Sequence, residues 1–435
     1  MFDMNRHAIL TGLVFLILMA TPHRPASGIE EPAPPKPWTL EQSITYALEH
    51  SPVLAEARHD WGVTKARQGH SRSAQLPRLA ANLSHFSQGP VVEFFGEKVG
   101  LEFRNTAIFS VTQPIIAPEL SARHRQASHI AQASGANYEA TRHQVILEAT
   151  KAYLEELKAG QLLIVAEASK QLAQEWLRVA EAQFKAGNQP KYDVLRAEVG
   201  IASAEEQLTV ARNNVAIAKA IFNNVLGRPI DTPVVLQPLE VNMDAANQLK
   251  EKAAYLFSNR PEIYGLTQSI RAAREGEQAA RASTYPSILF SADYTFQRST
   301  VFMKPLSWNV GMGMMIPLFD SGATRSGVRE AKEKRRALNA IRLQLEQSIE
   351  LEVRKAQVNI KAACQRNLTN ARAVRHANEA VRIAKLRYEA NLAPLLEVLD
   401  AETALTNART NLINARYDYA MSQANYKFAT GTLER

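Results

Sequence analysis

Two stretches of the chain carry small or apolar residues at alternating steps of four and three, which is the spacing of a coiled-coil seam. The two runs are separated by a constant 204 residues. About every second seam position is alanine, so the predicted helices can approach closely. The first run is Ala197, Ile201, Ala204, Leu208, Ala211, Val215, Ala218 and Phe222, and the second is Ala401, Leu405, Ala408, Leu412, Ala415, Tyr419, Ser422 and Tyr426.

The segments that precede these runs predict unusually long helices. Residues 119–185 contain no proline, and residues 323–389 contain no proline and one glycine. At 1.5 Å per residue each would extend for ~100 Å. Turn residues at 186–190 and 390–394 end both segments, so each is predicted to fold back as an antiparallel helical hairpin.

Strand-like segments interrupt the helical parts in two places. Apolar residues alternate there with polar or small ones over about ten residues, the period and length of transmembrane β-strands. For one such hairpin a soluble two-sided sheet is the better explanation, but two hairpins at equivalent places favour a membrane barrel. The predicted strands include residues 79–83, 106–112, 287–296 and 307–316.

The whole pattern occurs twice along the chain. Pro77 and Pro286, 209 residues apart, both open a strand-like run. FKAGNQPKYDVLRAE (184–198) aligns with YEANLAPLLEVLDAE (388–402) at the offset of 204. We therefore assign a first repeat at 38–230, a linker at 231–244, a second repeat at 245–431 and a short tail at 432–435.

The start of the chain predicts export from the cytoplasm. Arg6 and His7 precede a mostly apolar stretch of 13 residues, and small residues and prolines follow. This is the arrangement of a secretory signal peptide, with an uncleaved interfacial anchor as the alternative. We assign residues 1–28 to the signal, with cleavage after either Ala20 or Gly28, and 29–37 to a proline-rich leader. No later segment has 18 consecutive apolar residues, so membrane entry would need β-strands.

Four strands are too few to form a closed barrel. About eight strands are the minimum, and open strand edges are not tolerated in lipid. The chain is therefore predicted to oligomerise, with eight strands from two copies or twelve from three. The helices would stack in the same way below the barrel and form a tube.

Composition argues against several other classes. Cys364 is the single cysteine, which excludes a disulfide framework, and the ten histidines are scattered. The net charge of +8 comes from basic residues interleaved with glutamate, which indicates solvated helix faces rather than a nucleic-acid interface. The sequence has no HExxH, GxSxG or CxxC motif and no phosphate-binding glycine loop, so we predict no catalytic residues, no metal site, no cofactor and no enzyme activity.

The duplicated unit, the two aligned turn segments and the terminal ATGTL (429–433) resemble the TolC family of outer-membrane efflux proteins. The resemblance covers nearly all of residues 38–431. It implies an α+β membrane protein: a homotrimer with a twelve-stranded β-barrel in the outer membrane of a Gram-negative bacterium. Coiled-coil hairpins would continue the barrel as a periplasmic α-barrel.

The same resemblance implies a function and partners. Such a protein is a passive exit duct of a tripartite efflux or secretion system, and it works with a periplasmic adaptor and an inner-membrane transporter. Drugs, metal cations and exported proteins are all open as cargo. The alternative is a periplasmic adaptor or scaffold without a pore, but an adaptor would carry one helical hairpin, and this chain has two.

The resemblance also assigns candidate site residues. The family closes its periplasmic tip with acidic residues of a DVLDA motif, which reads EVLDA here and gives the role to Glu397 and Asp400. Three copies would place six carboxylates in one cation-favouring constriction. Asp193 and Tyr388 match a tip network, whereas Ala393 stands where the family usually has a basic residue. Without the resemblance, Glu397 and Asp193 would be solvated first-turn acids.

The turns at the tip are expected to meet the adaptor. Ordinary helix termination explains the same residues equally well, because glycine or asparagine followed by proline ends many helices. The hairpin loops near Pro90–Gly100 and Arg298–Pro305 would then be extracellular. The predicted adaptor contacts are Gly187, Asn188, Gln189, Pro190, Asn391, Leu392, Ala393 and Pro394.

Overall fold

The computed structural model describes residues 37–87, 92–99, 103–239, 259–297 and 305–433. The predicted signal peptide, the leader up to residue 36 and the loop 298–304 lie outside the described residues. So do residues 240–244 of the predicted linker and 434–435 of the tail.

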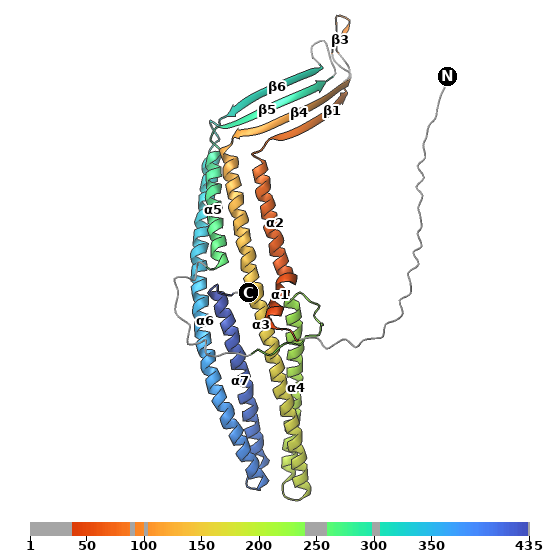
Figure 1. Ribbon diagram of the computed structural model, residues 1–435, viewed down its shortest axis with the longest axis vertical. Coiled ribbons are helices and arrows are strands. Elements are labelled where there is room, and N and C mark those ends of the chain that lie inside the picture. Colours follow the sequence, from red (N-terminus) through yellow and green to blue (C-terminus); the bar gives the residue numbers. More distant parts are fainter. Residues whose placement is uncertain (1–36, 88–91, 100–102, 240–258, 298–304, 434–435) are drawn as a thin grey trace, which may run out of the picture. The chain divides into compact units, whose positions relative to one another are not determined.

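The described chain contains seven helices, and after α1 they follow the same order in two halves, α2–α3–α4 and α5–α6–α7 (Figure 1). The two long helices predicted from the absence of proline are confirmed, with 68 residues in α3 and 67 in α6. Each then folds back as an antiparallel partner, α4 or α7. The helices are α1 (Leu40–His50), α2 (Pro52–Ser73), α3 (Pro118–Lys185), α4 (Lys191–Val225), α5 (Pro261–Ala282), α6 (Ala323–Glu389) and α7 (Leu395–Ala429).

The predicted coiled-coil seams form the contact inside each helical hairpin. None of the predicted seam residues is exposed, which confirms the spacing of four and three. Phe222 at the end of α4 packs with Tyr153 of α3 and with α1. Tyr419 of α7 packs against Ile360 and Ala363 of α6. Small alanines between these large residues let the two helix axes approach closely.

Four antiparallel strands form one sheet at the end of the helices (Figure 1). The order is β1 (Arg78–Ser87), β4 (Phe103–Ile116), β5 (Ser287–Gln297) and β6 (Leu306–Met315), so the strands of the two halves meet at the β4–β5 pair. All four predicted strands are confirmed.

The sheet has one apolar and one mostly polar face. Its register places Ala81, Phe109, Tyr294 and Trp308 in one row, and Ala80, Ser110, Asp293 and Asn309 in a row of the opposite face. The apolar residues of β5 run from Ile288 to Phe296, which at ~3.4 Å per residue and the ~40° tilt of barrel strands gives a band about 20 Å tall. This matches the membrane-facing surface that the alternation predicts.

The edges of the sheet are unpaired within the part of the chain that the structure describes. β1 and β6 each pair on one side only. Unpaired backbone N–H and C=O groups cost several kcal/mol each in a lipid environment, so one copy cannot span a bilayer alone. Among the described helices, none combines the length and the apolar character that a membrane crossing requires.

The loop near Pro90–Gly100, predicted only as a connection, contains a short hairpin of its own. β2 (Val92–Phe94) pairs with β3 (Glu97–Val99) across a two-residue turn. Phe95 and Gly96 both have positive φ, 53° and 80°, as a type I′ turn requires. The strands are too short for alternation to predict them.

The last helix of each half, α4 or α7, is followed by a glycine in the left-handed conformation. Gly227 and Gly431 have φ of 74° and 66°. A Cβ on Gly227 would lie 2.6 Å from the carbonyl oxygen of His50, and one on Gly431 would lie 2.6 Å from that of Asn259. Both positions therefore need glycine for conformation and for space.

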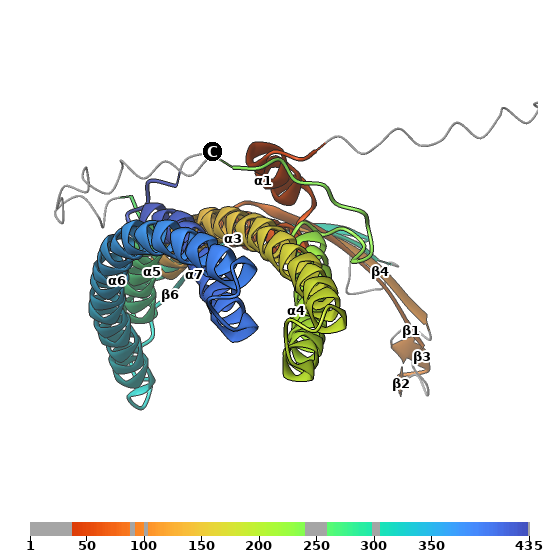
Figure 2. The same cartoon turned by 90° about the horizontal axis from the view of Figure 1, so that it is seen from below.

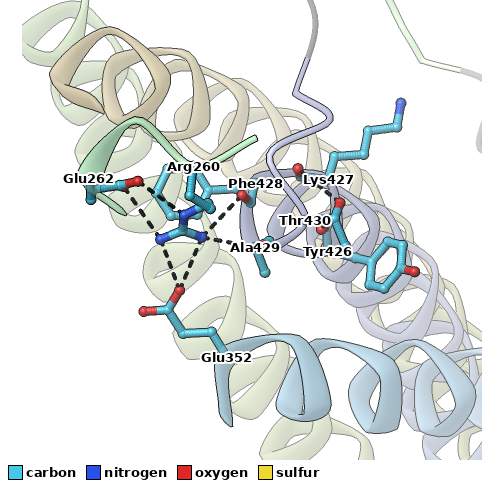
Figure 3. Close-up of polar contacts among 8 residues, drawn as sticks. All are labelled: Arg260, Glu262, Glu352, Tyr426, Lys427, Phe428, Ala429 and Thr430. Carbon is cyan, nitrogen blue, oxygen red and sulfur yellow. Dashed lines mark hydrogen bonds and ion pairs between the residues drawn. The ribbon is translucent and has the colours of Figure 1, made fainter. Parts of the chain in front are cut away.

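The second half adds a buried arginine that contacts three helices (Figure 3). Arg260 precedes α5 and is 5% exposed. Its guanidinium lies 3.1 Å from Glu262 Oε2 and 3.3 Å from Glu352 Oε2 on α6. It also donates to the carbonyls of Phe428 and Ala429, at 3.3 and 3.2 Å; the Phe428 carbonyl accepts from the Gly431 N–H as well, at 3.0 Å.

Candidate functional site

The end of the molecule opposite the sheet consists of two turns with the same hydrogen-bond pattern. After α3, Gly187 has φ of 75° and Asn188 N–H donates to the Gln183 carbonyl at 3.0 Å. After α6, Asn391 has φ of 56° and Leu392 N–H donates to the Arg387 carbonyl at 2.8 Å. Both are Schellman-type ends.

These turns expose most of the predicted adaptor-contact residues. Helix termination explains their backbone chemistry, and contact with an adaptor stays a prediction. Leu392 is the large apolar side chain among them and is 71% exposed. The exposed residues are Gly187, Asn188, Pro190, Asn391, Leu392 and Pro394, whereas Gln189 is half-buried and Ala393 is buried.

A cluster of buried side chains joins the two hairpins just inside the turns. Trp176 of α3 and Tyr388 of α6 meet edge to face, with ring centroids 5.9 Å apart and planes at 79°. Leu395 and Val398 of α7 are fully buried in the same cluster. We call these residues the tip cluster: Trp176, Ala180, Ala197, Ala384, Tyr388, Leu395 and Val398.

Asp193, predicted for the tip network, is buried beside this cluster. It is 4% exposed, so it is not a solvated first-turn acid. The backbone N–H of Leu395 donates to its carboxylate, which connects α4 to the first turn of α7. Burial raises the pKa of Asp193, and this N–H opposes the rise.

The other predicted member of the network, Tyr388, lies close to Asp193 without bonding to it. Burial raises the pKa of the Tyr388 hydroxyl, and the nearby Asp193 charge raises it further. Within the described residues, Tyr388 Oη and Asp193 Oδ2 are buried and have no hydrogen-bond partner. The structure thus brings the two side chains together and leaves one polar atom on each unsatisfied.

A lysine that the sequence analysis missed also belongs to this region. Lys385 Nζ lies 5.4 Å from the centroid of the Trp176 ring and 3.2 Å from Glu402 Oε1 on α7. It therefore connects α6 both to its own hairpin partner and to the neighbouring hairpin. Trp176 stands among alanines and leucines of a coiled-coil helix, and this unusual residue could have suggested a special contact at this point of α3.

The two predicted constriction acids have different surroundings. Glu397 is half-buried and pairs with Arg387 Nη1 at 2.8 Å, whereas Asp400 is exposed. Arg387 therefore supplies a basic group near the turn even though Ala393 does not. The position of Arg387 in the last turn of α6 could have suggested this role, because basic residues are favoured at the end of a helix.

Asp400 lines a cleft between the hairpins together with Arg196 and Trp176. The tip thus combines an apolar contact between hairpins with carboxylates on and beside a cleft. Such a surface can close a passage by packing and favour cations by charge. Within the described ranges, no group of three or more His, Cys, Asp or Glu side chains is arranged to hold a metal ion.

The sequence matches the family described as "Outer membrane efflux protein" over residues 44–228 and 255–432. It is 24% identical over 409 residues to outer membrane protein TolC of Vibrio cholerae, covering 91% of each chain. It is 23% identical over 414 residues to the alkaline protease secretion protein AprF of Pseudomonas aeruginosa, covering 89% of this chain and 83% of that one.

The fold is similar to that of solved outer membrane channels. The structure of the Campylobacter jejuni CmeC outer membrane channel superimposes with a TM-score of 0.79 at 18% identity, covering 91% of this chain and 87% of that one. The Neisseria gonorrhoeae MtrE outer membrane channel in its open state gives a TM-score of 0.74 at 23% identity, covering 91% and 90%.

Proposed function

This chain belongs to the outer membrane efflux protein family, and on that premise we propose that three copies form an exit duct closed at its periplasmic tip. The protein is an outer-membrane channel that extends into the periplasm. The unpaired edges of β1 and β6 support assembly of several copies, and membership of the family supports three. Three four-stranded sheets joined edge to edge give twelve strands, with the apolar face toward lipid and the polar face toward the lumen.

The partners in this proposal are a periplasmic adaptor and an inner-membrane transporter. Exposed turns after α3 and α6 give the adaptor a surface at the tip, and Leu392 offers it an apolar contact. A passive duct needs such partners because its own residues supply no energy for transport. Among the relatives, AprF is named for the secretion of an alkaline protease, so an exported protein is one cargo class to test.

The tip cluster and the acids beside it are the proposed gate. Tyr388 and Trp176 hold the α6–α7 hairpin against α3, and Asp193 accepts from Leu395 on the same hairpin. Releasing these contacts would let α6 and α7 move away from α3 and α4. Glu397 and Asp400 would then form the acidic lining through which cargo passes, with Arg387 neutralising part of that charge.

The double substitution Glu397→Ala/Asp400→Ala tests the acidic lining. We expect the purified full-length channel to lose most of its preference for K⁺ over Cl⁻, since six carboxylates disappear per trimer. The measurement is the reversal potential in a planar bilayer under a salt gradient, and the single-channel conductance should rise as the cation trap is removed.

The matched control removes the same charge elsewhere on the hairpins. Glu175 and Glu379 are exposed acids that pair with Arg178 and Arg382 on their own helices. Glu175→Ala/Glu379→Ala should keep the wild-type selectivity. Equal selectivity in all three proteins would place the constriction at other residues.

A further inference from the structure

Arginines gather on one side of the helices close to the sheet. A groove on that side is lined by Lys65 of α2 and Gln132 of α3. Residues seven apart lie on the same face of a coiled-coil helix. One such step toward the sheet leads from Lys65 to Arg72 and from Gln132 to Arg125. Both arginines are therefore on the face where the groove opens.

The third helix contributes an arginine to the same side. Tyr264 of α5 lines the groove, and Gln278 lies two heptad steps farther toward the sheet. Arg125 Nη2 donates to Gln278 Oε1 at 3.2 Å, which confirms that the two faces adjoin. Arg281 follows Gln278 by three residues and is its neighbour on the helix surface. We call Arg72, Arg125 and Arg281 the arginine collar.

The collar lies on the side of the helices that carries α1. Ala131 lines the groove, and heptad steps lead from it along α3 to Tyr138 and Val145, which pack with the residues of α1. Seen from below, α6, α3 and α4 follow an arc, and α1 lies on its convex side (Figure 2). In a tube built from several copies the convex side is the outside.

The collar is close to the apolar face of the sheet and remains exposed. Arg72 and Arg281 each lie one residue before the end of their helix and six residues before the next strand, and Arg125 lies seven residues after the start of α3, ~10 Å along that helix. Arg125 pairs with Glu275 at 2.7 Å and Arg281 with Glu277 at 2.6 Å, yet the two arginine side chains are 51% and 59% exposed. Arg72 is exposed and has no ion pair in the described chain.

We propose that the arginine collar binds the phosphate groups of anionic phospholipids in the periplasmic leaflet of the outer membrane. In the proposed barrel the apolar face begins at Leu79 on β1 and Ile288 on β5, seven residues after Arg72 and Arg281, so headgroups of that leaflet would lie near the height of the collar. Basic residues at a membrane surface attract anionic headgroups, and guanidinium groups bind phosphate through two N–H donors at once. The proposal depends on the sheet crossing the membrane and is independent of the gate.

Lipid binding by the full-length protein tests the collar. The protein is purified in a neutral detergent and titrated with phosphatidylglycerol or with phosphatidylcholine, and bound lipids are counted by native mass spectrometry. We expect the wild type to prefer phosphatidylglycerol at least fivefold. The variant Arg72→Gln/Arg281→Gln should bind phosphatidylglycerol roughly tenfold more weakly, because two of the three headgroup contacts are lost.

A matched control removes two arginines that lie at a similar distance from the junction of helices and sheet, but on the side opposite the collar. Arg67 lies on the other side of the contact between α2 and α3, and Arg78 lies on the polar face of the sheet. Arg67→Gln/Arg78→Gln should keep the wild-type preference, with circular dichroism showing that both variants fold. A wild type that does not distinguish the two lipids, or an equal loss in the control, would overturn the proposal. Binding that inorganic phosphate displaces as well as phosphatidylglycerol does would overturn it too.

Discussion

Replacing Arg260 with methionine is expected to lower the stability of the protein by about 2 kcal/mol, because the charge-assisted hydrogen bonds of a buried guanidinium to α5, α6 and α7 are lost. Glu262 and Glu352 would keep only water as a partner, and the Ala429 carbonyl would lose the donation from Arg260, whereas the Phe428 carbonyl would keep the Gly431 N–H. Methionine fills the space but supplies no N–H group. The measurement is the midpoint of chemical or thermal unfolding followed by circular dichroism in detergent.

Two further variants separate the guanidinium geometry from general effects of substitution. The stability of Arg260→Lys should lie between that of the wild type and that of Arg260→Met, since one ammonium group cannot reach both carboxylates and both carbonyls. Arg271→Met removes an exposed arginine from the same helix and should change stability by less than about 0.5 kcal/mol. If Arg260→Met lowered the stability no more than Arg271→Met does, the junction of α5, α6 and α7 would not depend on the Arg260 side chain.

Replacing Tyr388 with alanine is expected to open the tip. The ring packs edge to face on Trp176 of the other hairpin and is 2% exposed. Removing it should weaken the contact between hairpins by at least about 2 kcal/mol, which corresponds to a roughly thirtyfold higher ratio of open to closed channels. Single-channel recording should show longer openings and a higher mean conductance.

A tyrosine elsewhere at the tip provides the comparison. Tyr192 lies in the first turn of α4 and is 59% exposed. Tyr192→Ala should leave the open fraction as in the wild type. A closed Tyr388→Ala channel, in protein shown to be folded, would mean that the tip cluster does not hold the gate shut.

The helical framework was predictable because its signals are local and repeated. The bounds of α6 and all but the first residue of α3 follow from the absence of proline and the two turn segments. The seam positions follow from a strict spacing of four and three. The same spacing recurs 204 residues later, so the prediction for one half supports the prediction for the other. The strands followed from alternation, but the short β2–β3 hairpin did not, because three residues give no period.

The tip was predictable in position but not in its contacts. Burial of Asp193 depends on packing against the other hairpin. The residues next to it in the sequence therefore predict a solvent-exposed acid. The pair of Arg387 and Glu397 depends on the turn geometry that brings two helix ends together across ten residues. Lys385 contacts Trp176 from a helix more than 200 positions away. Such contacts arise from tertiary packing and leave no periodic signal.

The most direct test of the account is the current through the purified wild-type protein in a planar lipid bilayer. The account predicts discrete steps of low conductance with cation selectivity, as expected of a trimeric duct that the tip cluster keeps nearly closed and acidic side chains line. Folded protein that inserts without producing current steps, or that conducts anions in preference to cations, would contradict it.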